Sequence, residues 1–297
     1  MNREQYLAKP EVARFAMWLK HMIHDLSPSG FHHEYLIEPK GKSTIKKKWS
    51  CNSLFDAYRN YEWSFSYFDC FTNSTVKGKT YAESEASLKY LRDLLKVAAD
   101  QGDNEKCFHV CCMILKWGGV LGSETHGNKQ KLIAMKSYLA EYLSAVKRYF
   151  ESTCKLEKNY TVELGNRVEE IRMNSGFTKI YSLLCDEFII YDSRVGASLG
   201  LLVRHFIESE NSSYHKVPEG LSFYYGKAKN TKVNRDPSAG AYVFRALSNH
   251  AASHTSNNIK ANWLIGSLDL KKSPDFSKTS DPCRAFEAAL FMVGYKI

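Results

Sequence analysis

The longest regular pattern in the chain is a run of apolar residues spaced alternately three and four positions apart. Its members are Leu132, Met135, Leu139, Tyr142, Val146 and Tyr149. This spacing places all of them on one face of an α-helix, whereas a half-buried strand would show a period of two. The pattern therefore predicts an amphipathic helix over residues 132–149. Since such a face must be buried against other elements, it favours a helical layer.

Shorter patterns of the same kind predict further helices. Pro10 opens one over residues 10–26, and a second contains Leu88, Leu91 and Leu95 and stops near Gly102. Other helical patterns cover residues 105–117, 239–253, 257–268 and 282–294. The aromatic-rich residues 45–71 fit a short helix followed by strands, although periodicity does not decide between the two there. We expect a mainly α protein with at most a small β component.

The length of 297 residues allows one large core or two modest domains. We expect a single unit, and the alternative is that this unit consists of two helical lobes at about 1–125 and 126–297. No run approaches the roughly 18 apolar residues that cross a bilayer, and the N-terminus lacks the pattern of a signal peptide. These features predict a cytoplasmic, monomeric protein without a membrane partner.

Cysteine and histidine usage bears on metal and redox chemistry. The eight cysteines are scattered and include no C-x-x-C motif, so we expect buried, reduced thiols. His21, His24, His32 and His33 invite a metal interpretation, but no acidic or cysteine partner stands at ligand spacing. The sequence therefore predicts neither a metal nor a cofactor.

The charge of the chain points to an anionic partner. Lys and Arg number 41 against 32 Asp and Glu, which gives a net charge of +9. Two runs contain no acid, residues 40–48 and residues 226–235. We expect these runs to contact DNA phosphates, and the alternative is a pair of solvated loops. The lysines predicted to bind DNA are Lys46, Lys47, Lys48, Lys227 and Lys229.

Residues 162–206 form the most informative segment. A helix is predicted up to about Met173, followed by a tight turn in which Gly176 supplies a positive φ. A second short helix then holds Lys179, an apolar extended segment follows at 188–191, and Asp192 caps another helix. Small residues at 196–198 and 200 predict close approach of another backbone to this last helix.

This order of elements resembles the helix–hairpin–helix superfamily of DNA glycosylases, and most of all its branch with an 8-oxoguanine-glycosylase-like fold. The match covers about residues 166–204 and includes Ile-Tyr-Asp-Ser-Arg-Val at 190–195. The resemblance implies that Lys179 is the nucleophilic lysine and Asp192 the catalytic aspartate. It also implies that Gly176, with Thr178 beside it, approaches a DNA phosphate. The family's hairpin carries a second glycine where this chain has Thr178.

The resemblance implies an N-glycosylase that flips a damaged or modified base out of double-stranded DNA, with or without strand cleavage by Lys179. A carboxylate stabilises an oxocarbenium-like state, and an amine can attack the sugar carbon. A flipped base needs an aromatic pocket, for which Trp117 and Tyr191 are the candidates. Base-excision repair and defence against phage DNA both fit such an enzyme.

Each residue also has a structural interpretation. Asp192 is then only a helix cap, Lys179 a solvated helix residue and Trp117 part of the core. The corresponding alternative function is a non-catalytic DNA-binding protein with a degenerate glycosylase fold. A nuclease or toxin-like component is a third alternative. The sequence shows no paired acidic cluster of the kind that metal-dependent nucleases use, which weighs against it.

Overall fold

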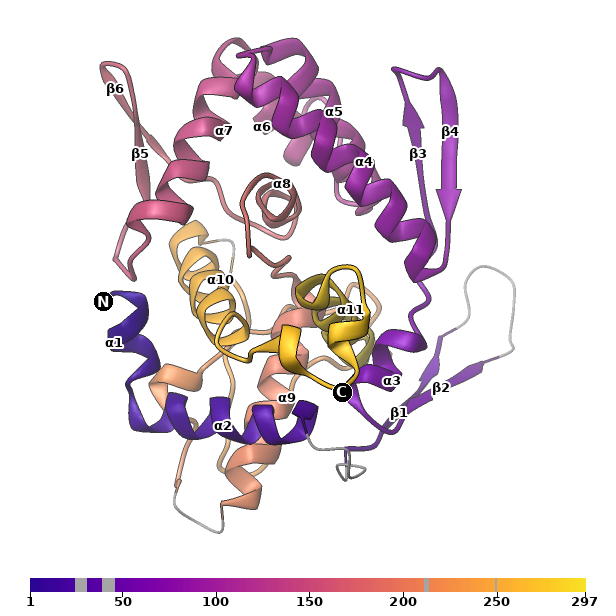
Figure 1. The fold of residues 1–297 in the computed structure, drawn as a ribbon, viewed down its shortest axis with the longest axis vertical. Helices are drawn as coiled ribbons and strands as arrows, with labels where there is room; N and C mark the ends of the chain where they lie inside the picture. The colour runs from indigo at the N-terminus through magenta and orange to yellow at the C-terminus, as the bar shows by residue number, and fades with distance from the viewer. Residues whose placement is uncertain (25–30, 39–45, 211–213, 249) are drawn as a thin grey trace. The chain divides into compact units, whose positions relative to one another are not determined.

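The computed structural model describes residues 1–24, 31–38, 46–210, 214–248 and 250–297 (Figure 1). Its regular structure is mostly helical, which confirms the mainly α prediction. Within the described residues, the strands pair as three separate two-stranded antiparallel sheets, β1–β2, β3–β4 and β5–β6. The β component is therefore small, as expected.

The chain divides into two units. Unit 1 consists of Met1–Tyr61, Tyr191–Ser248 and Lys260–Ile297, and unit 2 of Glu62–Ile190 and Asn249–Ile259. The lobe boundary predicted near residue 125 falls inside unit 2, and unit 1 is assembled from three segments that are distant in the sequence.

Unit 1 is built around α9 (Ser193–Ser209), which packs against α2 (Pro10–His24) and α11 (Pro282–Val293). Its other elements are α1 (Arg3–Leu7), β1 (His33–Ile37), β2 (Lys47–Cys51), α3 (Leu54–Arg59), and the 3-10 turns η3 (Glu219–Leu221), η4 (Leu270–Lys272) and η5 (Phe276–Lys278). The small residues of α9 do permit close approach. A Cβ on Gly196 would lie 2.2 Å from the Tyr224 carbonyl oxygen, and one on Gly200 would lie 2.5 Å from Pro237.

Unit 2 is a helical layer in which α8 (Phe177–Leu184) is the central element. Figure 1 shows α8 end-on among its packing partners α4 (Tyr81–Asp100), α5 (Asn104–Trp117) and α7 (Leu139–Arg148). All eight residues of α8 are buried. The remaining elements are β3 (Phe65–Asp69), β4 (Ser74–Gly78), α6 (Asn128–Ala134), η1 (Lys136–Tyr138), η2 (Tyr149–Thr153), β5 (Thr161–Leu164), β6 (Arg167–Glu170) and the start of α10 (Ala251–Ile265), whose end belongs to unit 1.

The predicted helix over residues 132–149 has the expected buried face but is not one helix. Residues 132, 135, 139, 142 and 146 are buried, yet the chain forms α6, the 3-10 turn η1, α7 and then a π-helical turn. Asn104 explains the break near η1, because its side chain donates to the Ser137 carbonyl and accepts from the Ala140 N–H. A side chain from α5 thus replaces backbone pairing at that point.

The helix predicted up to Met173 is wrong, since residues 161–170 form the β5–β6 hairpin. Val162 and Leu164 are buried while Thr161 and Glu163 are exposed, which is the period-two pattern of a half-buried strand. Gly165 adopts a φ of +54° in the turn. The hairpin therefore replaces the first helix of the helix–hairpin–helix arrangement.

Two other predictions differ from the structure in detail. Residues 239–248 are not helical, and the patterns at 239–253 and 257–268 correspond to the single helix α10. In the aromatic-rich stretch predicted at 45–71, the described residues from 46 onward form a strand, a short helix and another strand, namely β2, α3 and β3. In contrast, α2, α4, α5 and α11 lie close to their predicted bounds.

Candidate functional site

The turn before α8 is held by asparagine side chains. The Asn174 side-chain oxygen accepts from the N–H groups of Gly176 and Phe177, at 2.7 and 3.1 Å, and its amide donates to Asn128 at 2.9 Å. Gly176 has a φ of −83°, so the predicted positive φ is wrong. Glycine is needed here for space instead, because a Cβ would lie 2.2 Å from the Asn128 amide nitrogen.

These contacts correct the DNA contacts predicted for the turn. The Gly176 N–H that was expected to meet a phosphate donates to Asn174 instead, and Gly176 is buried. Thr178 has no exposed surface, and its hydroxyl lies 3.5 Å from the Ser175 carbonyl oxygen. In this structure neither residue presents a group to a phosphate.

Lys179 lies in the first turn of α8 and is only 5% exposed. Its amine donates to the Ser175 carbonyl oxygen at 2.8 Å, which fixes the end of the side chain. Its aliphatic stem crosses Gly118, where a Cβ would lie 2.4 Å from Cδ of Lys179. Gly118 therefore leaves room for this lysine. The sequence showed Gly118 only as the end of a helix, so this role was missed.

Trp117 lies next to Gly118 at the end of α5 and is buried. Its ring lies 6.1 Å from that of Phe65, between centroids. The indole N–H of Trp117 is buried and has no hydrogen-bond acceptor among the described residues. Because a buried donor without an acceptor is costly, this ring differs from an ordinary core residue. Trp117 thus remains a candidate for contact with a ligand.

Tyr191 has a core position rather than the pocket wall that was predicted. It has no exposed surface, and its hydroxyl donates to the Tyr224 carbonyl oxygen at 2.8 Å. Burial raises the pKa of this hydroxyl well above its ordinary value, so it stays protonated. Through this hydrogen bond Tyr191 holds the segment around Tyr224 against the start of α9.

Asp192 caps α9, as the sequence predicted. Its carboxylate accepts from the N–H groups of Arg194 and Val195 at 2.9 and 3.2 Å, and the residue is 8% exposed. A carboxylate at a helix N-terminus is stabilised by the hydrogen bonds and by the helix dipole. The sequence therefore places a fixed negative charge at this point of unit 1.

Two arginines accompany Asp192 in unit 1, and both interact with its charge. Burial, and then the neighbouring Arg235, lower the pKa of Arg194 to about 10, and its guanidinium lies 4.1 Å from the Phe291 ring centroid. Arg235 donates to the Ser193 hydroxyl at 2.7 Å and to the Tyr295 carbonyl at 3.2 Å. Arg235 is part of the second basic run, which was predicted to contact DNA phosphates. In the structure its guanidinium binds the Ser193 hydroxyl at the start of α9.

The basic runs differ in how their charges are met. Lys40 and residues 41–45 of the first run lie outside the described residues. On β2 and just before it, Lys46 lies 3.4 Å from Glu38 and Lys48 lies 2.8 Å from Glu34, and all three lysines at 46–48 are exposed. In the second run, Lys227 and Lys229 are exposed, and Lys227 interacts with the charge of Asp236. All five lysines belong to unit 1, and none of them is buried.

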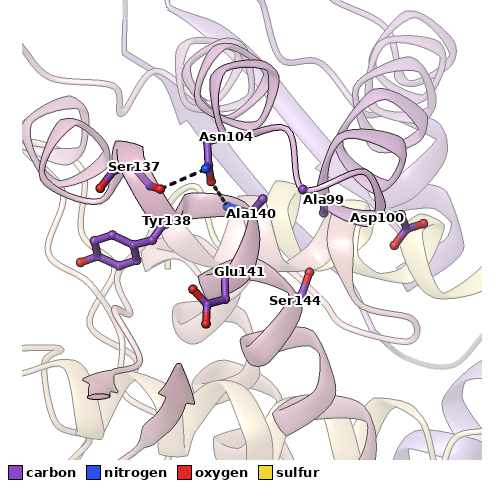
Figure 2. A pocket seen from close by; sticks show the side chains of 9 residues that line it. Ala99, Asp100, Asn104, Ser137, Tyr138, Ala140, Glu141 and Ser144 are labelled. Atoms are coloured by element: carbon purple, nitrogen blue, oxygen red, sulfur yellow. Dashed lines mark hydrogen bonds between the residues drawn. The ribbon is translucent and has the colours of Figure 1, made fainter. Parts of the chain in front are cut away.

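A hollow of about 260 Å³ opens in unit 2 between the end of α4 and the starts of α5 and α7 (Figure 2). Figure 2 shows the Asn104 side chain bridging Ser137 and Ala140 at this hollow, near the carboxylates of Asp100 and Glu141. Neither Trp117 nor Lys179 lines it. It is therefore distinct from the base pocket that the sequence suggested.

The described residues show no metal cluster, no membrane-spanning helix and no disulfide. They bring no three His, Cys, Asp or Glu side chains into a group that could hold a metal ion. No helix in the described ranges has the length and apolar character needed to cross a membrane. The eight cysteines all lie in described segments and form no disulfide, with four of them buried.

The chain matches no protein-family model, no curated protein and no solved structure. The candidate site therefore has to be judged on its own residues. Lys179 with Trp117 and Gly118 belongs to unit 2, and Asp192 with its arginines belongs to unit 1.

Proposed function

We propose that the chain is a DNA glycosylase that excises a damaged or modified base, with Lys179 and Asp192 as its catalytic residues. The observation that carries the proposal is the position of Lys179. Lysine side chains are seldom buried, yet Lys179 is only 5% exposed and lies in a helix that is buried throughout. An amine held inside the protein at the start of a helix is the feature that supports chemistry here.

Asp192 supplies the second component. Breaking a glycosidic bond develops positive charge on the sugar, which a fixed carboxylate stabilises. Two backbone N–H groups hold this carboxylate in place, and the neighbouring Arg194 and Arg235 interact with its charge. The buried indole donor of Trp117 adds a group that could bind an acceptor on a flipped base.

The proposal is tested with a panel of duplexes, each containing one damaged or modified base, followed by heating in alkali. We expect the wild-type protein to yield strand cleavage at the modified position of at least one duplex. The variant Asp192→Asn should retain the cap but lose the charge, and its cleavage should fall by at least about 100-fold.

Circular dichroism is needed as a control, because Asn leaves the charges of Arg194 and Arg235 less compensated. We therefore expect Asp192→Asn to lower the melting temperature, and both proteins should be assayed well below the variant's transition. Undiminished cleavage by folded Asp192→Asn would reduce the aspartate to a structural cap.

The second candidate is a DNA-binding protein without catalysis. The bond from Lys179 to the Ser175 carbonyl favours it, because an amine held in this way has a structural role. The β5–β6 hairpin in place of a helix also departs from the glycosylase arrangement. This candidate predicts binding of the duplexes in the panel with no release of any base.

A further inference from the structure

The β3–β4 hairpin of unit 2 has aromatic residues on both faces. Phe65 and Tyr67 are buried on the inner face. On the outer face Phe68 is 54% exposed and pairs with Thr75 across the ribbon, and Phe71 in the turn is 44% exposed. Exposed aromatic side chains that gather at one end of a ribbon are typical of a contact surface.

The turn that carries Phe71 is fixed by Asp69. This carboxylate accepts from the Phe71 N–H, the Thr72 hydroxyl and the Tyr90 hydroxyl, each at 2.9 Å. Burial acts to raise the pKa of Asp69, but these hydrogen bonds outweigh it and hold the pKa below its ordinary value. Because the turn is already ordered, little conformational entropy is lost when a partner binds it.

The hairpin also offers no exposed negative charge. Asp69 is the only acid among residues 64–79, and it is buried. Lys77 and Lys79 are exposed, and Lys79 lies 2.7 Å from Glu62, just outside the ribbon. The surface thus combines aromatic side chains, hydroxyl groups and positive charge.

The β5–β6 hairpin of the same unit provides a contrast. It too exposes an apolar residue, Val168, which is 66% exposed, but it also exposes the carboxylates of Glu163 and Glu170. Exposed apolar surface is therefore common to both ribbons, and the sign of the charge distinguishes them. Of these two ribbons of unit 2, β3–β4 is the one that is complementary to an anionic partner.

We propose that the β3–β4 hairpin is a DNA-contacting surface, on which Phe68 and Phe71 pack against bases and Lys77 meets a phosphate. Aromatic side chains contact bases by stacking or as wedges between them, and lysine supplies the charge that the backbone requires. This inference rests on the proposed function, because it identifies the partner of the ribbon as the same DNA.

The experiment measures the Kd of a fluorescent duplex by anisotropy over a range of salt concentrations, with the full chain. Phe68→Ala and Phe71→Ala should each weaken binding by about 5-fold or more, with the salt dependence unchanged. Lys77→Ala should reduce the slope of log K against log salt by about 0.9. Val168→Ala, the matched control on β6, should bind as the wild type does.

Thermal melting accompanies each variant, and we expect no change because the substituted side chains are exposed. If wild-type protein binds DNA and both Phe variants bind equally well, the hairpin is not a DNA surface, while the proposed glycosylase is unaffected. If the wild type itself binds no duplex, the proposed function fails together with this inference.

Discussion

At the scale of single residues, Lys179 is opposed by two electrostatic effects. The dipole of α8 disfavours a cation in its first turn by about 0.3–1 kcal/mol, and removing an ammonium from water costs several kcal/mol. A charge-assisted hydrogen bond to a carbonyl returns about 1.5–3 kcal/mol. The bond from Lys179 to the Ser175 carbonyl is of this kind. A lysine buried in the first turn of a helix is therefore a candidate for catalysis.

The first prediction concerns covalent chemistry at Lys179. If its amine attacks the sugar carbon as the base departs, the resulting Schiff base is reducible. We expect borohydride to trap a protein–DNA adduct with a substrate duplex, visible as a shifted band in a denaturing gel. Lys179→Gln, which retains a hydrogen-bond donor for Ser175, should form none.

Two other outcomes of the trapping experiment are informative. Base release without an adduct would mean that Asp192 activates water and that the enzyme does not use its lysine as a nucleophile. An adduct of unchanged yield with Lys179→Gln would contradict the assignment and point to another amine.

At the scale of elements, the sequence predicted local features better than their surroundings. The helix cap at Asp192 depends only on its side chain and on the N–H groups two and three residues later, and it was predicted correctly. The hairpin at 161–170 was missed because Arg167–Glu170 contain charged residues compatible with a helix, whereas the strand pattern is carried by Val162 and Leu164 alone. Four-residue strands give too few alternations to outweigh a helical expectation.

The turn before α8 shows a second reason for failure at this scale. A glycine before a helix suggested a positive φ, but Gly176 is required by Asn128, which is 48 positions away in the sequence. Close approach of a distant side chain leaves no local pattern. The same reason hid the contact between Gly118 and the stem of Lys179.

The second prediction tests this packing. In Gly176→Ala the new Cβ collides with the Asn128 amide, which also donates to the Val120 carbonyl at 2.7 Å. We expect a loss of about 1–3 kcal/mol in the free energy of unfolding, measured by urea denaturation. The matched variant is Asn128→Ala, alone and combined with Gly176→Ala.

A double-mutant cycle then separates collision from general damage. Removing the Asn128 side chain should relieve the closest contact, although the new Cβ would still lie 2.9 Å from Cδ2 of Leu115. The double variant should therefore lose less stability than the sum of the single variants. Strictly additive losses would show that the glycine is not required by Asn128.

At the scale of the whole molecule, composition predicted an excess of positive charge, and the structure shows which of these charges lie beside acidic side chains. The net charge of +9 suggests a polyanionic partner, but the structure shows that individual lysines differ in their neighbours. Lys48 faces Glu34 on the paired strand β1, and Lys46 faces Glu38 just after that strand. The three lysines at 46–48 and these two glutamates together carry a net charge of +1. Such pairing is invisible to a count along residues 40–48.

The last prediction follows from this difference between the two basic runs. Each phosphate contact contributes about 0.9 to the slope of log K against log salt. A lysine that leaves a glutamate in order to meet a phosphate contributes less, so replacing Lys46 and Lys48 together by Ala should lower the slope by clearly less than the value of about 1.8 for two full contacts. Replacing the exposed Lys227 and Lys229 should lower the slope by more, up to about 1.8, although the same number of lysines is removed. Titrations of one duplex at several salt concentrations measure both slopes. Equal losses per lysine in the two variants would show that Glu34 and Glu38 do not compete with DNA, and unchanged slopes in both would leave the two runs as solvated surface.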